Sequence, residues 1–140
     1  MSSRRDFIKK SAIIGTGIAM SPSLSFGAND PYKDKKIKVG LIGVGLRGTN
    51  HLNNVLLRDD VLVTAICDVD SRRIAIALDR IEKAGEKKPK VFGKNELDYK
   101  NLLEEDDVEA VIISTPWLWH TRMAKDAMLA GVYAGLEVSA

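Results

Sequence analysis

The sequence predicts an α/β domain built on a doubly wound parallel sheet. Apolar, strand-like runs alternate with helix-like segments from residue 37 onward, and a glycine-rich turn joins the first strand to the first helix. An aspartate, Asp68, ends the second strand-like run. The run at 110–114 is nearly pure in apolar residues, as expected of a parallel strand that helices cover on both faces.

Each element follows from its local pattern. We expect strands at 37–42, 61–67, 91–92, 110–114 and 132–138. We expect helices at 47–58, from 71 to about 85, at 99–103 and at 119–130. The apolar residues that fall on one face of the first two helices are Leu52, Val55 and Leu56, then Ile74, Ala77, Leu78 and Ile81. Ser71 is the expected cap of the second helix, and the acidic turn at 104–107 is expected to be a solvated loop.

The glycine-rich turn G-V-G-L-R-G occupies residues 43–48, directly after the first strand. Gly43 permits a tight turn, Gly45 lets the backbone approach a pyrophosphate, and Gly48 lets the helix sit close to the sheet. The phosphates would lie on the free N–H groups of the helix start. This motif is weak alone, but a strand before it, a helix after it and an acid twenty residues on make it specific.

Asp68 indicates the cofactor. Its carboxylate can accept hydrogen bonds from both hydroxyls of an adenosine ribose, and its charge would repel the 2′-phosphate of NADP. The sequence therefore predicts a Rossmann-type domain, residues 37–140, that binds NAD.

The N-terminus carries a second signal. Two arginines, Arg4 and Arg5, precede an uncharged stretch at 11–28 whose apolar part is too short to span a bilayer. We interpret residues 1–27 as a twin-arginine signal peptide cleaved after Gly27, and residues 28–36 as a linker. The chain would then meet the twin-arginine export machinery and reach the periplasm, without a membrane span. The alternative is a basic tail beside a short buried helix.

Composition excludes several other functions. Four of the 21 basic residues and one of the 19 acidic residues lie in the first 27 positions, so the remainder has 17 basic and 18 acidic residues. A net charge of −1 gives no indication of nucleic-acid binding. Cys67 is the one cysteine, which excludes an internal disulfide, and we expect a small buried side chain there. The two histidines, His51 and His120, lack partners at metal-ligand spacing, so no metal site is expected.

The motifs resemble a known family. The glycine turn, the strand-terminal aspartate, T-P-x-x-x-H at 115–120 and a strand-terminal glutamate resemble the N-terminal domain of the glucose-fructose oxidoreductase and inositol dehydrogenase superfamily (Gfo/Idh/MocA). More closely, G-V-G-L-R-G-x-x-H, D-Y-K-N-L-L, P-W-L-W-H and G-L-E-V-S resemble glycoside hydrolase family 109. The resemblance covers the whole chain but only the first third or so of a family member.

The resemblance implies the roles of individual residues. Besides the three glycines, it assigns cofactor contacts to Leu46, Arg47, Asp68, Trp117, Leu118, Trp119, His120, Glu137 and Val138. The last six would lie on the nicotinamide side. Many sugar dehydrogenases of the superfamily have a lysine after the glutamate as a base, and Val138 stands in its place here. No catalytic residue is assigned.

Structural explanations compete with these roles. Trp117 and Trp119 would cover the sheet edge, and His120 would bond a neighbouring backbone group. Arg47 would be a solvated charge at the helix start, and Glu137 a surface residue. For His51, on the first helix, we expect a structural role rather than a catalytic one.

The function implied by the resemblance is hydrolysis of α-N-acetylgalactosaminides with recycled NAD. A small-molecule glycoside would be the substrate, and we expect the C-terminal substrate domain to be absent from this chain. Two alternatives stay open, a periplasmic sugar dehydrogenase and a non-catalytic NAD-binding fragment. The sequence does not determine the oligomeric state.

Overall fold

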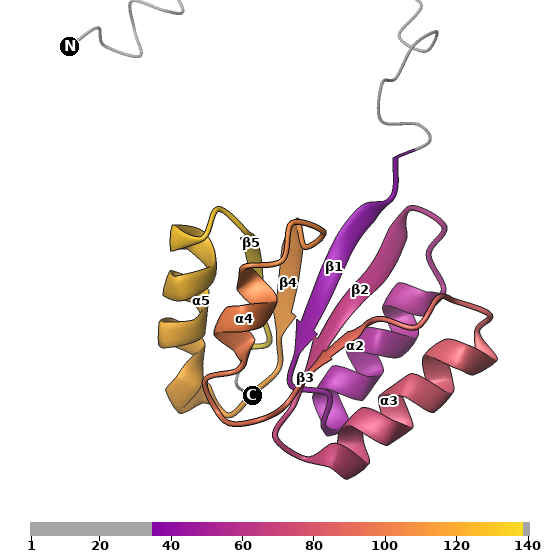
Figure 1. Cartoon of the computed structure of the whole chain (residues 1–140), viewed down its shortest axis with the longest axis horizontal. Helices are drawn as coiled ribbons and strands as arrows, with labels where there is room; N and C mark the ends of the chain where they lie inside the picture. The colour runs from indigo at the N-terminus through magenta and orange to yellow at the C-terminus, as the bar shows by residue number, and fades with distance from the viewer. Residues whose placement is uncertain (1–34, 139–140) are drawn as a thin grey trace, which may run out of the picture. The chain divides into compact units, whose positions relative to one another are not determined.

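The structure of this protein is a computed structural model that describes residues 35–138. The predicted signal peptide, most of the predicted linker and the last two residues lie outside this range, so the first two stay predictions. The described residues form a five-stranded parallel sheet with helices packed on it (Figure 1). None of the helices within 35–138 is long and apolar enough to cross a membrane.

The strands are β1 (Ile37–Ile42), β2 (Val61–Cys67), β3 (Lys90–Phe92), β4 (Ala110–Ile113) and β5 (Tyr133–Leu136). The helices are α2 (Leu46–Leu56), α3 (Ser71–Lys83), α4 (Tyr99–Leu103) and α5 (His120–Leu129), with a 3₁₀ helix, η2 (Trp117–Trp119), before α5. The sheet order is β3-β2-β1-β4-β5, and every neighbouring pair is parallel. The chain winds outward from β1 in both directions, which confirms the doubly wound prediction.

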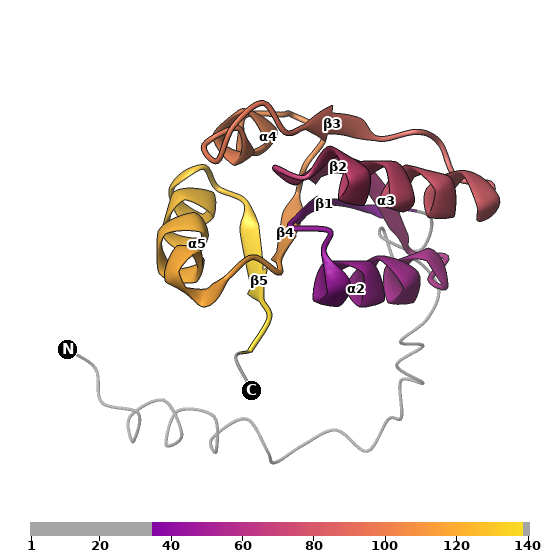
Figure 2. The same ribbon diagram turned by 90° about the horizontal axis from the view of Figure 1, so that it is seen from below.

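Helices cover both faces of the sheet, so the core has two parts. Figure 2 shows α2 and α3 on one face and α4 and α5 on the other. On the first face, Leu52 and Ile81 pack with Leu41 and Ile66 of the central strands. On the second face, buried side chains of α4 and α5 pack with the opposite sides of β2 and β4, among them the fully buried Leu102. The predicted apolar helix faces are therefore correct.

Several element boundaries differ from the prediction. The cap of α3 is Asp70, whose side chain accepts a hydrogen bond from the Arg72 N–H at 2.9 Å, and Ser71 is already helical. Ser71 was the wrong choice because Asp70 is an equally good capping residue one position earlier. The first helix begins at Leu46 and ends two residues earlier than expected.

The last strand is also shorter than expected. β5 covers 133–136 rather than 132–138. It starts one residue later than expected because the Val132 N–H bonds the Ala127 carbonyl and so closes the end of α5.

Candidate functional site

Four residues mark the carboxyl edge of the sheet. Gly43, Asp68, Ser114 and Glu137 each follow directly after a strand. Their backbone N–H groups continue the sheet hydrogen bonding, from Gly43 to Cys67, from Asp68 to Phe92, from Ser114 to Ile42 and from Glu137 to Ile113, at 2.8–3.1 Å. In open α/β sheets ligands bind at this edge, where the strand order reverses. Here the reversal lies between β1 and β4.

The glycine turn depends on two close backbone approaches. Gly43 has φ +86°, and a side chain there would lie 2.9 Å from the Ser114 carbonyl carbon. A Cβ on Gly48 would lie 1.9 Å from the Gly43 carbonyl oxygen, well inside contact distance. A Cβ on Gly45, in contrast, would meet nothing within 4 Å. Gly43 and Gly48 are therefore required by the fold, while the space over Gly45 is open.

Asp68 holds the glycine turn from β2. Its Oδ2 accepts from the Val44 N–H at 2.8 Å, and its Oδ1 accepts from the Asp70 N–H at 2.9 Å. Each ionised oxygen can accept more than one hydrogen bond, so both keep capacity for a ligand. Gly93 packs directly on this residue, since a Cβ there would lie 2.5 Å from the Asp68 carbonyl oxygen. The carboxylate is thus fixed at the strand end.

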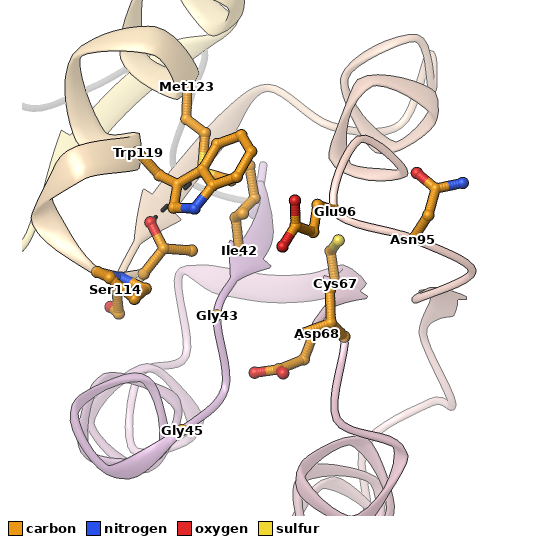
Figure 3. Close-up of a pocket in the computed structure, with 13 residues that line it drawn as sticks. Ile42, Gly43, Gly45, Cys67, Asp68, Asn95, Glu96, Ser114, Trp119 and Met123 are labelled. Atoms are coloured by element: carbon orange, nitrogen blue, oxygen red, sulfur yellow. Dashed lines mark hydrogen bonds between the residues drawn. The ribbon is translucent and has the colours of Figure 1, made fainter.

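Two hollows flank the segment that follows β4. The first encloses about 290 Å³ on the β2 side, and Figure 3 shows Asp68, Cys67 and Glu96 around it, opposite Trp119. The second encloses about 400 Å³ on the β5 side, where Arg47 and Glu137 border it. The residues that border both hollows are Ser114, Thr115 and Pro116. An extended ligand could lie across this segment with one half in each hollow.

Glu137 joins two elements that lie far apart in the sequence. Its Oε1 accepts from Arg47 Nε at 3.1 Å and from Arg47 Nη2, and its Oε2 bonds His51 Nε2. The Glu137 side chain is 12% exposed, so the alternative explanation, a surface residue, does not hold, while the predicted cofactor contact stays a prediction. Arg47 is not a merely solvated charge either. The Arg47 guanidinium, and then the His51 ring, lower the pKa of Glu137 below its usual value.

The segment at 117–120 has two exposed side chains, followed by two that contact the rest of the domain. Trp117 and Leu118 are 75% and 77% exposed, so Trp117 does not cover the sheet edge. Trp119 packs against the core and lies under the Arg122 guanidinium, 5.6 Å from the ring centre. His120 Nε2 lies 2.7 Å from the Thr115 carbonyl oxygen, which is the backbone bond expected of it. The other two assigned residues, Leu46 and Val138, are 75% and 79% exposed.

Sequence reasoning missed two residues at this edge. Asp98 is 3% exposed and accepts from the Gly93 and Lys94 N–H groups and from Asn101, which lowers its pKa. It holds the loop that carries Glu96. The pattern G-K-N-E-L-D, an acid after a glycine turn and before a helix, is the one signal for this anchor.

Ser114 is the second missed residue. In the described part of the chain, its Oγ is the one buried side-chain polar atom without a hydrogen-bond partner. A serine at the end of an apolar strand gives no sequence signal of this kind.

The remaining candidates have plain explanations. Cys67 is buried and free, and burial raises the pKa of its thiol to about 12, so it is the small buried side chain expected. Within residues 35–138, no group of three or more metal-ligating side chains comes together.

The residues at this edge fit a dinucleotide. No side chain caps the N-terminus of α2, and its first turn contains no acidic residue. Its first N–H groups therefore remain for an anion, and the open space over Gly45 is where the anion would approach. The unpartnered Ser114 hydroxyl and the spare acceptor capacity of Asp68 lie on the same edge. The fold and site thus define a dinucleotide-binding domain of the Rossmann type.

Comparison with known proteins identifies the family. The family model described as "Oxidoreductase family, NAD-binding Rossmann fold" (Gfo/Idh/MocA) matches residues 37–137. The chain belongs to this family, and its domain is an NAD-binding Rossmann fold.

Curated bacterial relatives 35–38% identical to the chain are named glycosyl hydrolase family 109 proteins. A relative from Shewanella oneidensis, named alpha-N-acetylgalactosaminidase, is 36% identical over 96% of this chain and 33% of its own length. The chain therefore spans about a third of the length of the curated relatives it matches.

Solved structures share the fold. Scyllo-inositol dehydrogenase from Lactobacillus casei with bound NAD(H) and scyllo-inositol matches with a TM-score of 0.61 and 23% identity, over 73% of this chain and 28% of that one. A mutant 3-ketoreductase from Actinomadura kijaniata in complex with TDP-benzene and NADP matches with a TM-score of 0.59 and 29% identity, over 74% and 30%. The fold therefore occurs with either cofactor, and the local residues must decide between them.

Proposed function

We propose that the chain is the cofactor domain of a glycosidase that hydrolyses α-linked N-acetylgalactosaminides by transient oxidation at C3, elimination across C1–C2 and addition of water. The supporting observation is the family 109 similarity over at least 96% of the chain, including a relative named for this activity. Glycosidases with NAD depart from the usual pair of carboxylates in the same way.

The chain's own residues would bind and orient the cofactor. The N–H groups at the start of α2 would hold the diphosphate over Gly45, and Asp68 would accept from the adenosine ribose. Trp117 and Val138 present exposed apolar surface at the second hollow, where the nicotinamide would lie. When bound, NAD would supply the reversible two-electron oxidation of the sugar C3 hydroxyl to a ketone.

The position of Val138 favours the glycosidase over an ordinary dehydrogenase. It borders the second hollow directly after Glu137, where the family resemblance places a lysine in many sugar dehydrogenases. A valine cannot accept the proton of the substrate hydroxyl. We place the groups that act on C2 and on the leaving oxygen in the part of the relatives' sequences that this chain does not match, about two thirds of their length.

Hydrolysis in D₂O tests the proposal. The protein assayed should contain this chain together with the C-terminal part that the relatives have. The C2 proton must leave and be replaced, so the released sugar should carry deuterium at C2 while NADH does not accumulate. Retention of the original C2 hydrogen would contradict the elimination route. Accumulation of NADH with an oxidised sugar would instead identify a dehydrogenase. The 140-residue chain alone, as the control, should bind NAD and hydrolyse nothing.

We also propose that residues 1–27 direct export by the twin-arginine pathway to the periplasm. The support is the S-R-R-D-F-I-K motif ahead of a mildly apolar stretch. Replacing Arg4 and Arg5 together by lysine keeps the charge and removes the planar guanidinium groups, so export should stop. Replacing Lys9 and Lys10 by arginine is the matched control and should leave export intact. Undiminished export of the Arg4/Arg5 variant would refute the assignment.

A further inference from the structure

His51 is set apart from the other residues of the site. It lies on α2 four residues after Arg47, so the two side chains share a helix face. Both reach Glu137, but Arg47 borders the second hollow and His51 does not. His51 therefore touches the site through Glu137 alone.

The two donors differ in how firmly they can hold Glu137. The Arg47 side chain is 63% exposed, whereas the His51 side chain is 32% exposed. An exposed ion pair to a long side chain contributes little, since solvent screens it and the side chain loses rotamer freedom. His51 has a short, half-buried side chain and occupies the other carboxylate oxygen. It is the less exposed of the two attachments.

The attachment of Glu137 fixes more than one side chain. β5 ends at Leu136, and one residue later the Glu137 N–H donates to the Ile113 carbonyl at 3.0 Å, which extends the pairing with β4. Glu137 and Val138 then border the hollow. A carboxylate held from α2 on both oxygens ties this strand end to the helix that begins at the glycine turn. Binding sites keep their geometry when such supporting hydrogen bonds lock the residues that line them.

We infer that His51 is a positioning residue for the nicotinamide half of the cofactor site, because it holds the Glu137 carboxylate and so sets the positions of Arg47 and Val138. The inference rests on NAD binding by this domain and not on the glycosidase chemistry. The lowered pKa of Glu137 agrees with it, since an ionised carboxylate accepts from both partners. His51 itself contacts no ligand.

Two ligands separate positioning from general loss of structure. NAD would occupy both hollows, while ADP carries only the adenosine and the two phosphates. His51→Ala should weaken NAD binding about tenfold, the scale of one hydrogen bond to a charged group, and leave ADP binding within about twofold. His51→Gln, which retains an N–H donor, should restore much of the NAD affinity. Asn54→Ala, at an exposed position of the same helix, is the matched control and should change neither.

Calorimetric titration of the 140-residue chain with each ligand provides the measurement. Equal weakening of NAD and ADP by His51→Ala would overturn the inference, because it would indicate a merely structural role. Unchanged NAD binding would overturn it as well, and so would failure of the unaltered chain to bind NAD. Failure of the glycosidase proposal would leave these binding results unaffected, so the two can be told apart.

Discussion

The starts of α2 and α3 occupy equivalent places, each following a central parallel strand, yet they are built differently. Asp70 caps α3 through the Arg72 N–H and pairs with the Arg72 side chain. The start of α2 has Gly45 at the cap position and no side-chain cap. The protein thus satisfies one helix start with a side chain and leaves the other without one, as an anion-binding helix start requires. A cap on α2 would fill the space that a phosphate needs.

The largest effect is expected from Gly48→Ala, which disturbs the α2 start itself. The added Cβ would lie 1.9 Å from the Gly43 carbonyl oxygen, so the turn or the helix must move. We expect the free energy of unfolding to fall by about 1–3 kcal/mol, as for other overpacked sites, and NAD binding to be lost. Chemical denaturation and calorimetric titration measure the two effects. A variant of normal stability and affinity would show that the turn differs from this structure.

Gly45→Ala should separate binding from folding. Its Cβ would meet no protein atom within 4 Å, and Gly45 has a negative φ of −65°, so the fold should tolerate the methyl group. The same group would occupy the space for the diphosphate, and we expect NAD affinity to fall about tenfold or more. The melting temperature without NAD should match that of the unaltered chain. Unchanged NAD affinity would place the phosphates elsewhere.

Asp68→Asn should moderately weaken both NAD binding and the stability of the fold. Val44 and Asp70 donate to different oxygens of Asp68, and asparagine puts an NH₂ group in place of one of them, so one of these N–H groups would face a donor. NAD affinity should fall about tenfold, since a charged acceptor for the ribose is lost. The unaltered chain should prefer NAD to NADP, and the variant should lose much of that preference. Titration with both cofactors decides the matter, and tighter NADP binding by the unaltered chain would contradict it.

The smallest effect is expected from Asp70→Ala, at the α3 start. The variant should melt a few degrees lower because a cap is lost, and its NAD affinity should be unchanged. Hydrogen bonds from Arg72 lower the pKa of Asp70 from 3.8 to about 2. A carboxyl group whose pKa is lower in the folded than in the unfolded protein stabilises the fold at pH values above its unfolded pKa. The stability difference between the two proteins should therefore be complete at neutral pH and shrink as the pH falls from about 4 towards 2.

Thermal melts across this pH range measure the difference. A constant deficit down to pH 2 would show that the charge of Asp70 does not contribute to the cap.

Sequence reasoning succeeded where the signal is local. The position of β1, the apolar faces of α2 and α3, and the turn at Gly43 each depend on residues that lie within a few positions of one another. It failed where neighbours in the chain offered equivalent choices, as with Asp70 and Ser71 at the start of α3. It could not predict the hydrogen bonds of Glu137, because the partners of this carboxylate, Arg47 and His51, lie 90 and 86 residues away.

The sequence by itself determined the kind of domain and its glycine turn, since the spacing of apolar residues and the need for glycine at a tight turn are properties of neighbouring residues. Only the tertiary structure decided which polar groups are used and which are left over. Asp68 holds Val44, and Glu137 joins β5 to α2, whereas the Ser114 hydroxyl stays unpartnered. The hydrogen-bond partners of these side chains depend on which strand ends lie side by side. The order of the strands in the folded sheet decides that.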